Sequence, residues 1–248
     1  MTAISGNNRI LEGVFNAGKS IINNATSSVT RTLAFAIEFI HNPKELSWMG
    51  ESSENSSKKI ISAVTNSNKK DRIILDLGAG VGPTTVLLLK EMKENDHLTA
   101  IECMPKLAKL LQKRVETVAE QLNLKKDQVE VFTGKIQDFS LKNRKADHIV
   151  CTIPLNNFSP EQLNDFFQQV DNDLLADGGT FSYIELTGFP TLTSTCLKVL
   201  SMFYNKPYLK FNSLLKTKEE YLKGKDVRKE IGWLNFPPRR VIHVSRQA

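Results

Sequence analysis

From residue 72 to residue 186 the chain alternates short apolar runs with segments of helical periodicity, and this alternation restricts the fold more than any other feature. Five apolar runs have the length of strands: 72–78, 97–102, 129–134, 146–155 and 178–186. Helical patterns lie between them, at 84–94, 105–122 and 160–175. Continuous apolar runs are typical of parallel strands buried on both faces, and helical connections of this length imply right-handed crossovers. The pattern predicts an α/β fold with a mostly parallel sheet, which a last apolar run at 239–246 completes as an edge strand.

The first part of the chain has a different pattern and predicts a helical arm. Apolar residues recur at spacings of three and four from Ile10 to Val29, and the cations Arg9 and Lys19 flank them. Such a helix can lie in the headgroup layer of a membrane, or it can simply cover the sheet. We predict two domains, an N-terminal amphipathic arm over residues 1–69 and a ligand-binding domain over residues 70–248.

Composition excludes several classes of protein. The chain of 248 residues is 40% hydrophobic and 24% charged, as in soluble globular proteins. Its three cysteines (Cys103, Cys151 and Cys196) have no CxxC spacing, and its four histidines have no zinc-ligand spacing. This set predicts reduced thiols in the cytoplasm and no metal site. A net charge of +6 and a basic, aromatic insert at 198–225 favour an anionic partner, either lipid headgroups or RNA phosphates.

A glycine-rich turn follows the first predicted strand. Asp76, Gly78, Gly80 and Gly82 alternate with other residues, at the carboxyl end of the strand where open α/β sheets bind ligands. Glycine allows a ligand to approach the backbone closely, although a tight turn that serves packing alone would also use it. The second strand ends in Glu102, whose carboxylate can accept both hydroxyls of a ribose. Asp76 disfavours a pyrophosphate and favours a cationic amino-acid group, and S-adenosylmethionine carries such a group together with a ribose and an adenine.

Residues 73–185 resemble a class I S-adenosylmethionine-dependent methyltransferase domain. ILDLGAGVG matches the first motif of this family, AIE matches the acidic end of its second strand, and GKIQDF places Asp138 near the adenine amino group. The resemblance implies S-adenosylmethionine as cofactor and a Rossmann-like, seven-stranded, mostly parallel sheet with helices on both faces. Cys103 and Thr152 complete the candidates at this end of the sheet. Alternatively, Asp138 is a solvated loop carboxylate and Glu102 a charge at a helix N-terminus.

The loop after the fourth strand bears on the acceptor. Enzymes that methylate adenine in RNA carry a motif like Asn-Ile-Pro-Tyr there, whereas this chain has Thr-Ile-Pro-Leu at 152–155 and lacks both the amide and the stacking ring. IPLNNF at 153–158 instead resembles the Leu-Pro-Leu segment of bacterial phospholipid N-methyltransferases. WLNFPPRRVIHV at 233–244 and the segment 39–60 also resemble that family, and the latter match places Ser56 and Ser57 near the cofactor.

The resemblance implies an enzyme that methylates phosphatidylethanolamine and its methylated intermediates toward phosphatidylcholine. It would be a cytoplasmic protein, peripheral on the inner face of the membrane, that contacts anionic or zwitterionic phospholipid through residues 1–30. The candidate catalytic residues at the carboxyl edge of the sheet are Asn156, Glu185 and Tyr183. Two alternatives stay open: a methyltransferase for RNA adenine or a small-molecule amine, with RNA the less favoured partner, and a non-catalytic cofactor-binding membrane protein.

Overall fold

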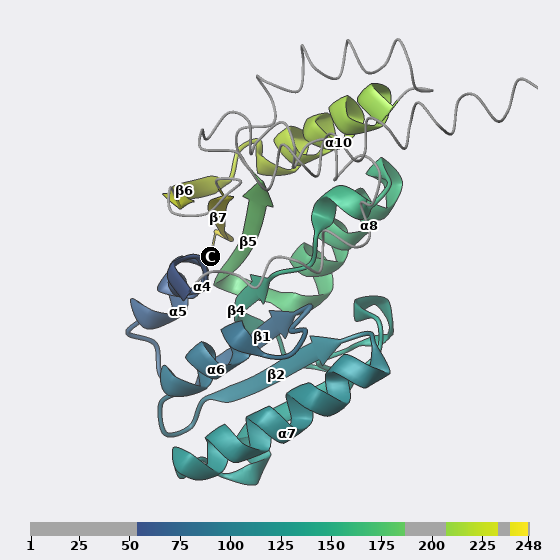
Figure 1. Ribbon diagram of the computed structural model, residues 1–248. Helices are drawn as coiled ribbons and strands as arrows, with labels where there is room; N and C mark the ends of the chain where they lie inside the picture. Colours follow the sequence, from purple (N-terminus) through teal and green to yellow (C-terminus); the bar gives the residue numbers. More distant parts are fainter. Residues whose placement is uncertain (1–53, 187–206, 233–238, 248) are drawn as a thin grey trace, which may run out of the picture. The chain divides into compact units, whose positions relative to one another are not determined.

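A computed structural model of the chain describes residues 54–186, 207–232 and 239–247 (Figure 1). These residues contain one seven-stranded sheet, in the strand order β3-β2-β1-β4-β5-β7-β6. The strands are β1 (Ile73–Leu77), β2 (His97–Glu102), β3 (Val129–Thr133), β4 (Ala146–Cys151), β5 (Leu175–Leu186), β6 (Asp226–Gly232) and β7 (Arg239–Ser245). The predicted α/β fold with a seven-stranded sheet is confirmed.

The sheet is parallel except at one strand. The pairs β2–β3, β1–β2, β1–β4 and β4–β5 are parallel, and β7 runs antiparallel to both β5 and β6. The chain proceeds outward from β1 to β3 and then returns to place β4 on the other side of β1. The carboxyl end of β1 is therefore the topological switch point, where ligands bind in open α/β sheets.

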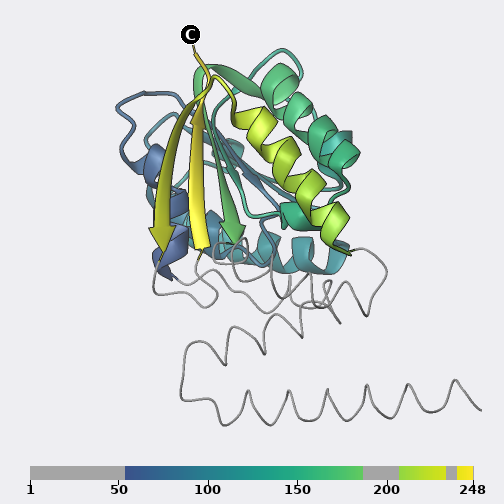
Figure 2. The ribbon, with the colours of Figure 1, turned by 90° about the horizontal axis from the view of Figure 1, so that it is seen from above.

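Helices cover both faces of the sheet (Figure 1 and Figure 2). The helices α4 (Glu54–Ile60), α5 (Ser62–Thr65), α6 (Pro83–Lys90) and α7 (Pro105–Gln121) share one apolar cluster with the sheet. On the opposite face, α8 (Pro160–Gln169) and α10 (Pro207–Leu222) pack against each other and cover a second cluster. Alternate residues of each strand supply the two clusters, for example Ile74 to the first and Leu75 to the second.

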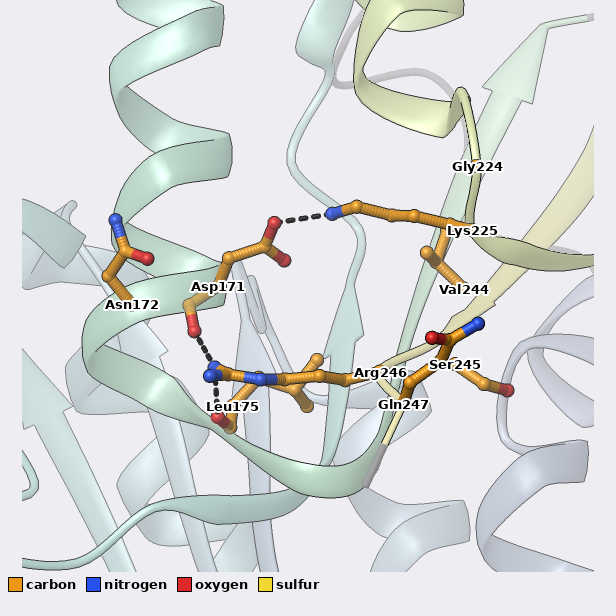
Figure 3. A pocket seen from close by; sticks show the side chains of 9 residues that line it. All are labelled: Asp171, Asn172, Leu175, Gly224, Lys225, Val244, Ser245, Arg246 and Gln247. Carbon is orange, nitrogen blue, oxygen red and sulfur yellow. Dashed lines mark hydrogen bonds and ion pairs between the residues drawn. The ribbon is translucent and has the colours of Figure 1, made fainter.

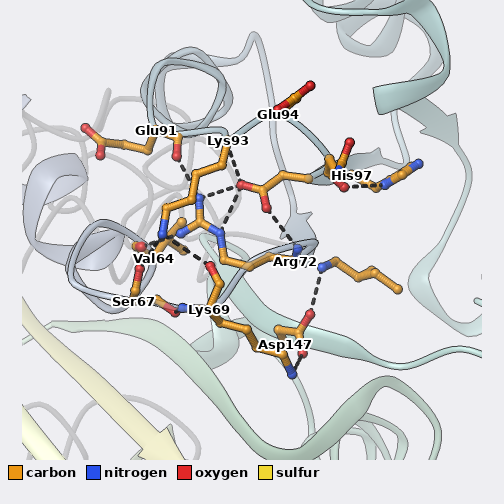
Figure 4. Close-up of polar contacts among 12 residues, drawn as sticks. Val64, Ser67, Lys69, Arg72, Glu91, Lys93, Glu94, His97 and Asp147 are labelled. Carbon is orange, nitrogen blue, oxygen red and sulfur yellow. Dashed lines mark hydrogen bonds and ion pairs between the residues drawn. The ribbon is translucent and has the colours of Figure 1, made fainter.

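A buried arginine fixes the amino edge of the sheet (Figure 4). Arg72 is fully buried, and its guanidinium donates to Asp96 Oδ2 from Nε at 3.0 Å and from Nη2 at 2.5 Å. Its Nη1 also donates to the Val64 carbonyl at 2.6 Å. Charge-assisted hydrogen bonds of this kind are strong and directional. They tie the start of β1 to α5 and to the loop before β2.

Two strands differ in detail from the sequence-based expectation, and a stretch without a predicted structure forms a helix. The strand predicted for 146–155 ends at Cys151, and β5 begins at Leu175, three residues before the predicted run at 178–186. The pairing of β5 with β4 shifts register near Gly178, which has a φ of 72°, and such a bulge hides the early part of the strand from a simple pattern. Residues 207–222 of the basic, aromatic stretch form α10.

The predicted N-terminal arm lies mostly outside the described residues. Its last part forms α4 and α5, and these helices place Ile60, Ile61 and Val64 in the apolar cluster of the sheet. The domain boundary after residue 69 stays a prediction. None of the helices in the described residues is long and apolar enough to cross a membrane.

Candidate active site

The glycine turn lies between β1 and α6 at the carboxyl edge of the sheet (Figure 1). Gly80 has a φ of 59°, and a Cβ built on it would meet no atom within 4 Å. A Cβ on Gly78 would instead come within 2.6 Å of Ile153 Cγ1, in the loop after β4. Gly78 therefore serves packing, whereas Gly80 borders open space of the kind that a ligand in close contact with the backbone needs.

Asp76 lies in β1 directly before this turn and is fully buried. Its Oδ2 accepts a hydrogen bond of 2.6 Å from Thr85 Oγ1, and its Oδ1 has no partner among the described residues. Burial raises the pKa of Asp76 to about 7; the hydrogen bond from Thr85 lowers the pKa, and the nearby charge of Glu102 raises it. A buried carboxylate with an unsatisfied oxygen favours a cationic group beside it.

Glu102 ends β2 and is held against the turn. Its Oε2 accepts from the Gly80 backbone nitrogen at 2.9 Å, and its Oε1 accepts from the Met104 nitrogen at 2.8 Å. A carboxylate has about four lone-pair sites, so each oxygen can accept a further bond from a ribose hydroxyl. The buried carboxylates of Asp76 and Glu102 are close enough for their charges to interact, and Glu102 is bonded to the turn at Gly80. Two carboxylates at this edge fit the ammonium and ribose groups of S-adenosylmethionine.

A second polar cluster lies where β4 and β5 end. Asn156 belongs to the short helix η3 (Leu155–Asn157) after β4, and Glu185 lies near the end of β5. The buried ammonium of Lys218, in α10, donates to Asn156 Oδ1 at 2.8 Å and to Glu185 Oε1 at 3.2 Å. Arg240 lies 3.9 Å from the other oxygen of Glu185. Two of the three predicted catalytic residues are therefore brought together around a single cation.

Tyr183, the third predicted catalytic residue, is fully buried in the apolar cluster beneath α8. Its ring stacks on Phe181 with centroids 5.3 Å apart, and its hydroxyl has no hydrogen-bond partner among the described residues. Burial raises the pKa of Tyr183 far above its ordinary value, and the charge of Glu185 raises it further. The phenol therefore stays neutral near pH 7 and is suited to donating a hydrogen bond, not to accepting a proton.

Comparisons with known proteins show what this chain is similar to. Residues 74–179 match the family model described as a methyltransferase domain. The fold resembles magnesium protoporphyrin IX methyltransferase from Synechocystis with bound SAH, with a TM-score of 0.57, 14% identity and 95% of each chain covered. It also resembles an O-methyltransferase from Streptomyces achromogenes in complex with SAM, with a TM-score of 0.55, 12% identity and 79% of each chain covered. Residues 74–179 of this chain are therefore similar to methyltransferase domains, and the fold resembles that of methyltransferases crystallised with SAM or SAH.

A curated relative comes from Singulisphaera acidiphila and is named ornithine lipid N-methyltransferase. It is 30% identical to this chain over 118 residues, which are 46% of the chain. The match spans 57% of the length of the relative.

The remaining cofactor-binding candidates occupy different environments. Thr152 follows β4, and its Oγ1 donates to the Gly78 carbonyl at 2.8 Å, so it supports the turn. Cys103 is exposed beside Glu102, and Asp138 is exposed in the short helix η2 (Ile136–Asp138) after β3. Ser57 is buried in α4, and its hydroxyl has no partner among the described residues. The side chain of Ser56 lies outside the described residues, and the assignment of all these residues to cofactor binding stays a prediction.

Lys218 is the site residue that the sequence analysis missed. It follows the buried Leu214 by four positions and precedes Tyr221 by three, so it lies on the buried face of α10. The ring of Tyr221 stacks on Phe167 of α8 with centroids 3.8 Å apart. A lysine at an apolar position of an amphipathic helix is the signal that could have identified it.

A separate pocket of about 340 Å³ lies at the opposite, amino edge of the sheet, beside the start of β5 and the end of β7 (Figure 3). The cations that line it are already engaged. Lys225 forms an ion pair with Asp171, and Arg246 donates to the Asp171 and Leu175 carbonyls and forms an ion pair with Asp177. These contacts tie the residues that follow α10 and β7 to the start of β5 and the segment just before it, and we assign them a structural role.

Proposed function

We propose that this chain is an S-adenosylmethionine-dependent methyltransferase that acts on the amine headgroup of a phospholipid and converts phosphatidylethanolamine and its methylated intermediates toward phosphatidylcholine. The proposal rests on two side-chain oxygens, Asn156 Oδ1 and Glu185 Oε1. Both accept hydrogen bonds from the ammonium group of Lys218, so the same oxygens are suited to binding a substrate amine. The name of the Singulisphaera relative, a lipid N-methyltransferase, supports the same chemistry. The Leu-Pro-Leu-like segment at 153–158 supports a phospholipid acceptor.

The residues of this edge have distinct roles in the proposed reaction. When bound, S-adenosylmethionine supplies an electrophilic methyl group on a sulfonium. The acceptor ammonium has no lone pair and must lose a proton before it can act as a nucleophile. Asn156 Oδ1 orients the amine, the Glu185 carboxylate accepts the proton, and Lys218 fixes the position of both oxygens. Alignment of the amine is the main contribution of the protein, because the displacement requires an in-line approach.

We further propose that the enzyme works on the cytoplasmic face of a membrane and contacts the bilayer through residues 1–30. These residues lie outside the described part of the chain, so the proposal depends on their apolar stripe and flanking cations alone.

Incubation with labelled S-adenosylmethionine tests the acceptor. Liposomes that contain phosphatidylethanolamine and total RNA are offered together, and the label is then located. Label in mono-, di- and trimethylated lipid supports the proposal. Label only in RNA contradicts it. Label in neither also contradicts it, in favour of a small-molecule amine acceptor or the non-catalytic alternative.

A variant pair tests the site. Glu185→Gln keeps the size of the side chain but cannot accept the proton, so we expect lipid methylation to fall by about a hundredfold or more with cofactor affinity unchanged. The matched control is Asp177→Asn, a carboxylate at the other end of β5 whose side chain is 68% exposed, and it should retain full activity. Equal activity of the two variants would exclude Glu185 as the proton acceptor.

A further inference from the structure

The start of α7 exposes apolar side chains that the sheet does not cover. Leu110 is 55% exposed, and Met104, directly before the helix, is 45% exposed. Single exposed hydrophobic residues are ordinary on protein surfaces. These two side chains differ because lysines lie around Leu110 and the candidate cofactor site lies nearby.

Lysines surround Leu110 on the helix surface. Lys106, Lys109 and Lys113 lie four positions before it, one before it and three after it, and all three are exposed. They form no ion pair with any residue in the described ranges. The first turn of α7 has no acidic residue, and its first carboxylate is Glu116, which accepts a hydrogen bond from Gln112. We call Met104, Lys106, Lys109, Leu110 and Lys113 the α7 surface.

The α7 surface borders the cofactor site. The helix begins three residues after Glu102 and lies along β2 (Figure 1). Arg114 Nη1 donates to the Val81 carbonyl in the glycine turn at 3.2 Å. Lys135, which is exposed after β3, lies close enough for its charge to influence the thiol of Cys103. The lysines of α7, Arg114 and Lys135 therefore form a basic surface that extends past the ends of β2 and β3.

We propose that the α7 surface docks on an anionic phospholipid bilayer and holds the carboxyl edge of the sheet against the headgroups. Lysines bury their aliphatic stems and keep their ammonium groups among phosphates, while Leu110 and Met104 enter the apolar layer beneath them. RNA would supply phosphates but no apolar layer for these two side chains, so the combination favours a bilayer. The functional role of this docking rests on the proposed function, because docking would bring the active site to a substrate that lies in the membrane. Binding itself does not depend on catalysis.

Sedimentation with vesicles tests the surface in the full chain. The variant Lys106→Gln/Lys109→Gln/Lys113→Gln removes three charges. Each lysine near an anionic surface contributes about fivefold, so we expect the partition coefficient on vesicles of phosphatidylglycerol and phosphatidylcholine to fall by at least about tenfold. The matched control Lys126→Gln/Arg144→Gln/Lys145→Gln removes three exposed charges before β3 and β4, at the opposite edge of the sheet, and should partition like the parent.

A second variant distinguishes the apolar contribution to membrane binding from the electrostatic one. Leu110→Gln should weaken partition by a factor that persists when salt is added, whereas the contribution of the lysines should disappear with salt. Equal partition of the two triple variants would overturn the proposal. Loss of RNA binding in the α7 variant with vesicle binding unchanged would overturn it as well. If no lipid is methylated in any assay, the proposed function fails, but the partition measurements still decide the role of the α7 surface.

Discussion

Replacement of Asp76 by asparagine should make the folded protein more stable and the cofactor complex weaker. The pKa of Asp76 is about 7 in the folded chain and 3.8 for an unperturbed side chain. Between these values the folded state holds a proton that the unfolded state has lost, so stability falls as the pH rises toward 7. The two pH units from 5 to 7 correspond to about 1.4 kcal/mol each, which gives a loss of about 3 kcal/mol in the parent. An asparagine side chain does not titrate, so this loss should be absent from the variant.

Urea unfolding at pH 5 and pH 8 measures this difference. From pH 5 to pH 8 the free energy of unfolding of the parent should fall by about 3 kcal/mol more than that of the Asp76→Asn variant. The full effect is expected because the side chain is fully buried and solvent does not screen it. The asparagine oxygen can still accept the bond from Thr85. Titration calorimetry should show weaker binding of S-adenosylmethionine, since the carboxylate that balances its ammonium is gone. If parent and variant lose stability equally from pH 5 to pH 8, the reasoning about Asp76 is wrong.

Three further predictions concern the same edge and the arm. Glu102→Ala should weaken S-adenosylmethionine binding by about 1–3 kcal/mol through lost charge-assisted hydrogen bonds, and unchanged affinity by calorimetry in a folded variant would contradict the proposed site. Gly80→Val should abolish cofactor binding while the variant still folds at low temperature, because the branched side chain fills the open space and disfavours a φ of 59°; normal binding and turnover would limit the turn to a packing role. Deletion of residues 1–30 should leave cofactor binding nearly intact and reduce sedimentation with anionic vesicles, whereas a lower melting temperature with vesicle binding retained would indicate that the arm covers the sheet.

Local patterns made it predictable that Asp76, Gly80 and Glu102 lie together at one edge of the sheet. Asp76, Gly80 and Glu102 lie at the ends of adjacent strands, and parallel strands bring their carboxyl ends to one edge whatever the details of packing. The bond from the Gly80 nitrogen to Glu102 Oε2 joins residues only 22 positions apart. Strand periodicity and one motif therefore suffice to place these residues together.

Other parts of the structure depend on long-range contacts that the sequence does not display. Lys218 and Asn156 are 62 positions apart in the sequence, and the pattern of residues 207–222 does not indicate which strand end the side chain of Lys218 faces. β6 was not recognised as a separate strand because it is an edge strand with the charged residues Asp226, Arg228, Lys229 and Glu230 and has little apolar alternation. The position of Tyr183 beneath α8 follows from packing of the apolar cluster, which a strand pattern cannot distinguish from a place in the site.

The geometry of α10 has a consequence for laboratory evolution of this protein. Lys218 and Tyr221 are three positions apart on one helix, so the cation beside Asn156 and Glu185 and the ring stacked on Phe167 move as one body. If the proposed acceptor site is right, core substitutions that tilt α10 will change which amines are accepted, even though they touch no substrate. Libraries that seek new acceptor specificity should randomise Phe167 and Tyr221 together with the loop after β4.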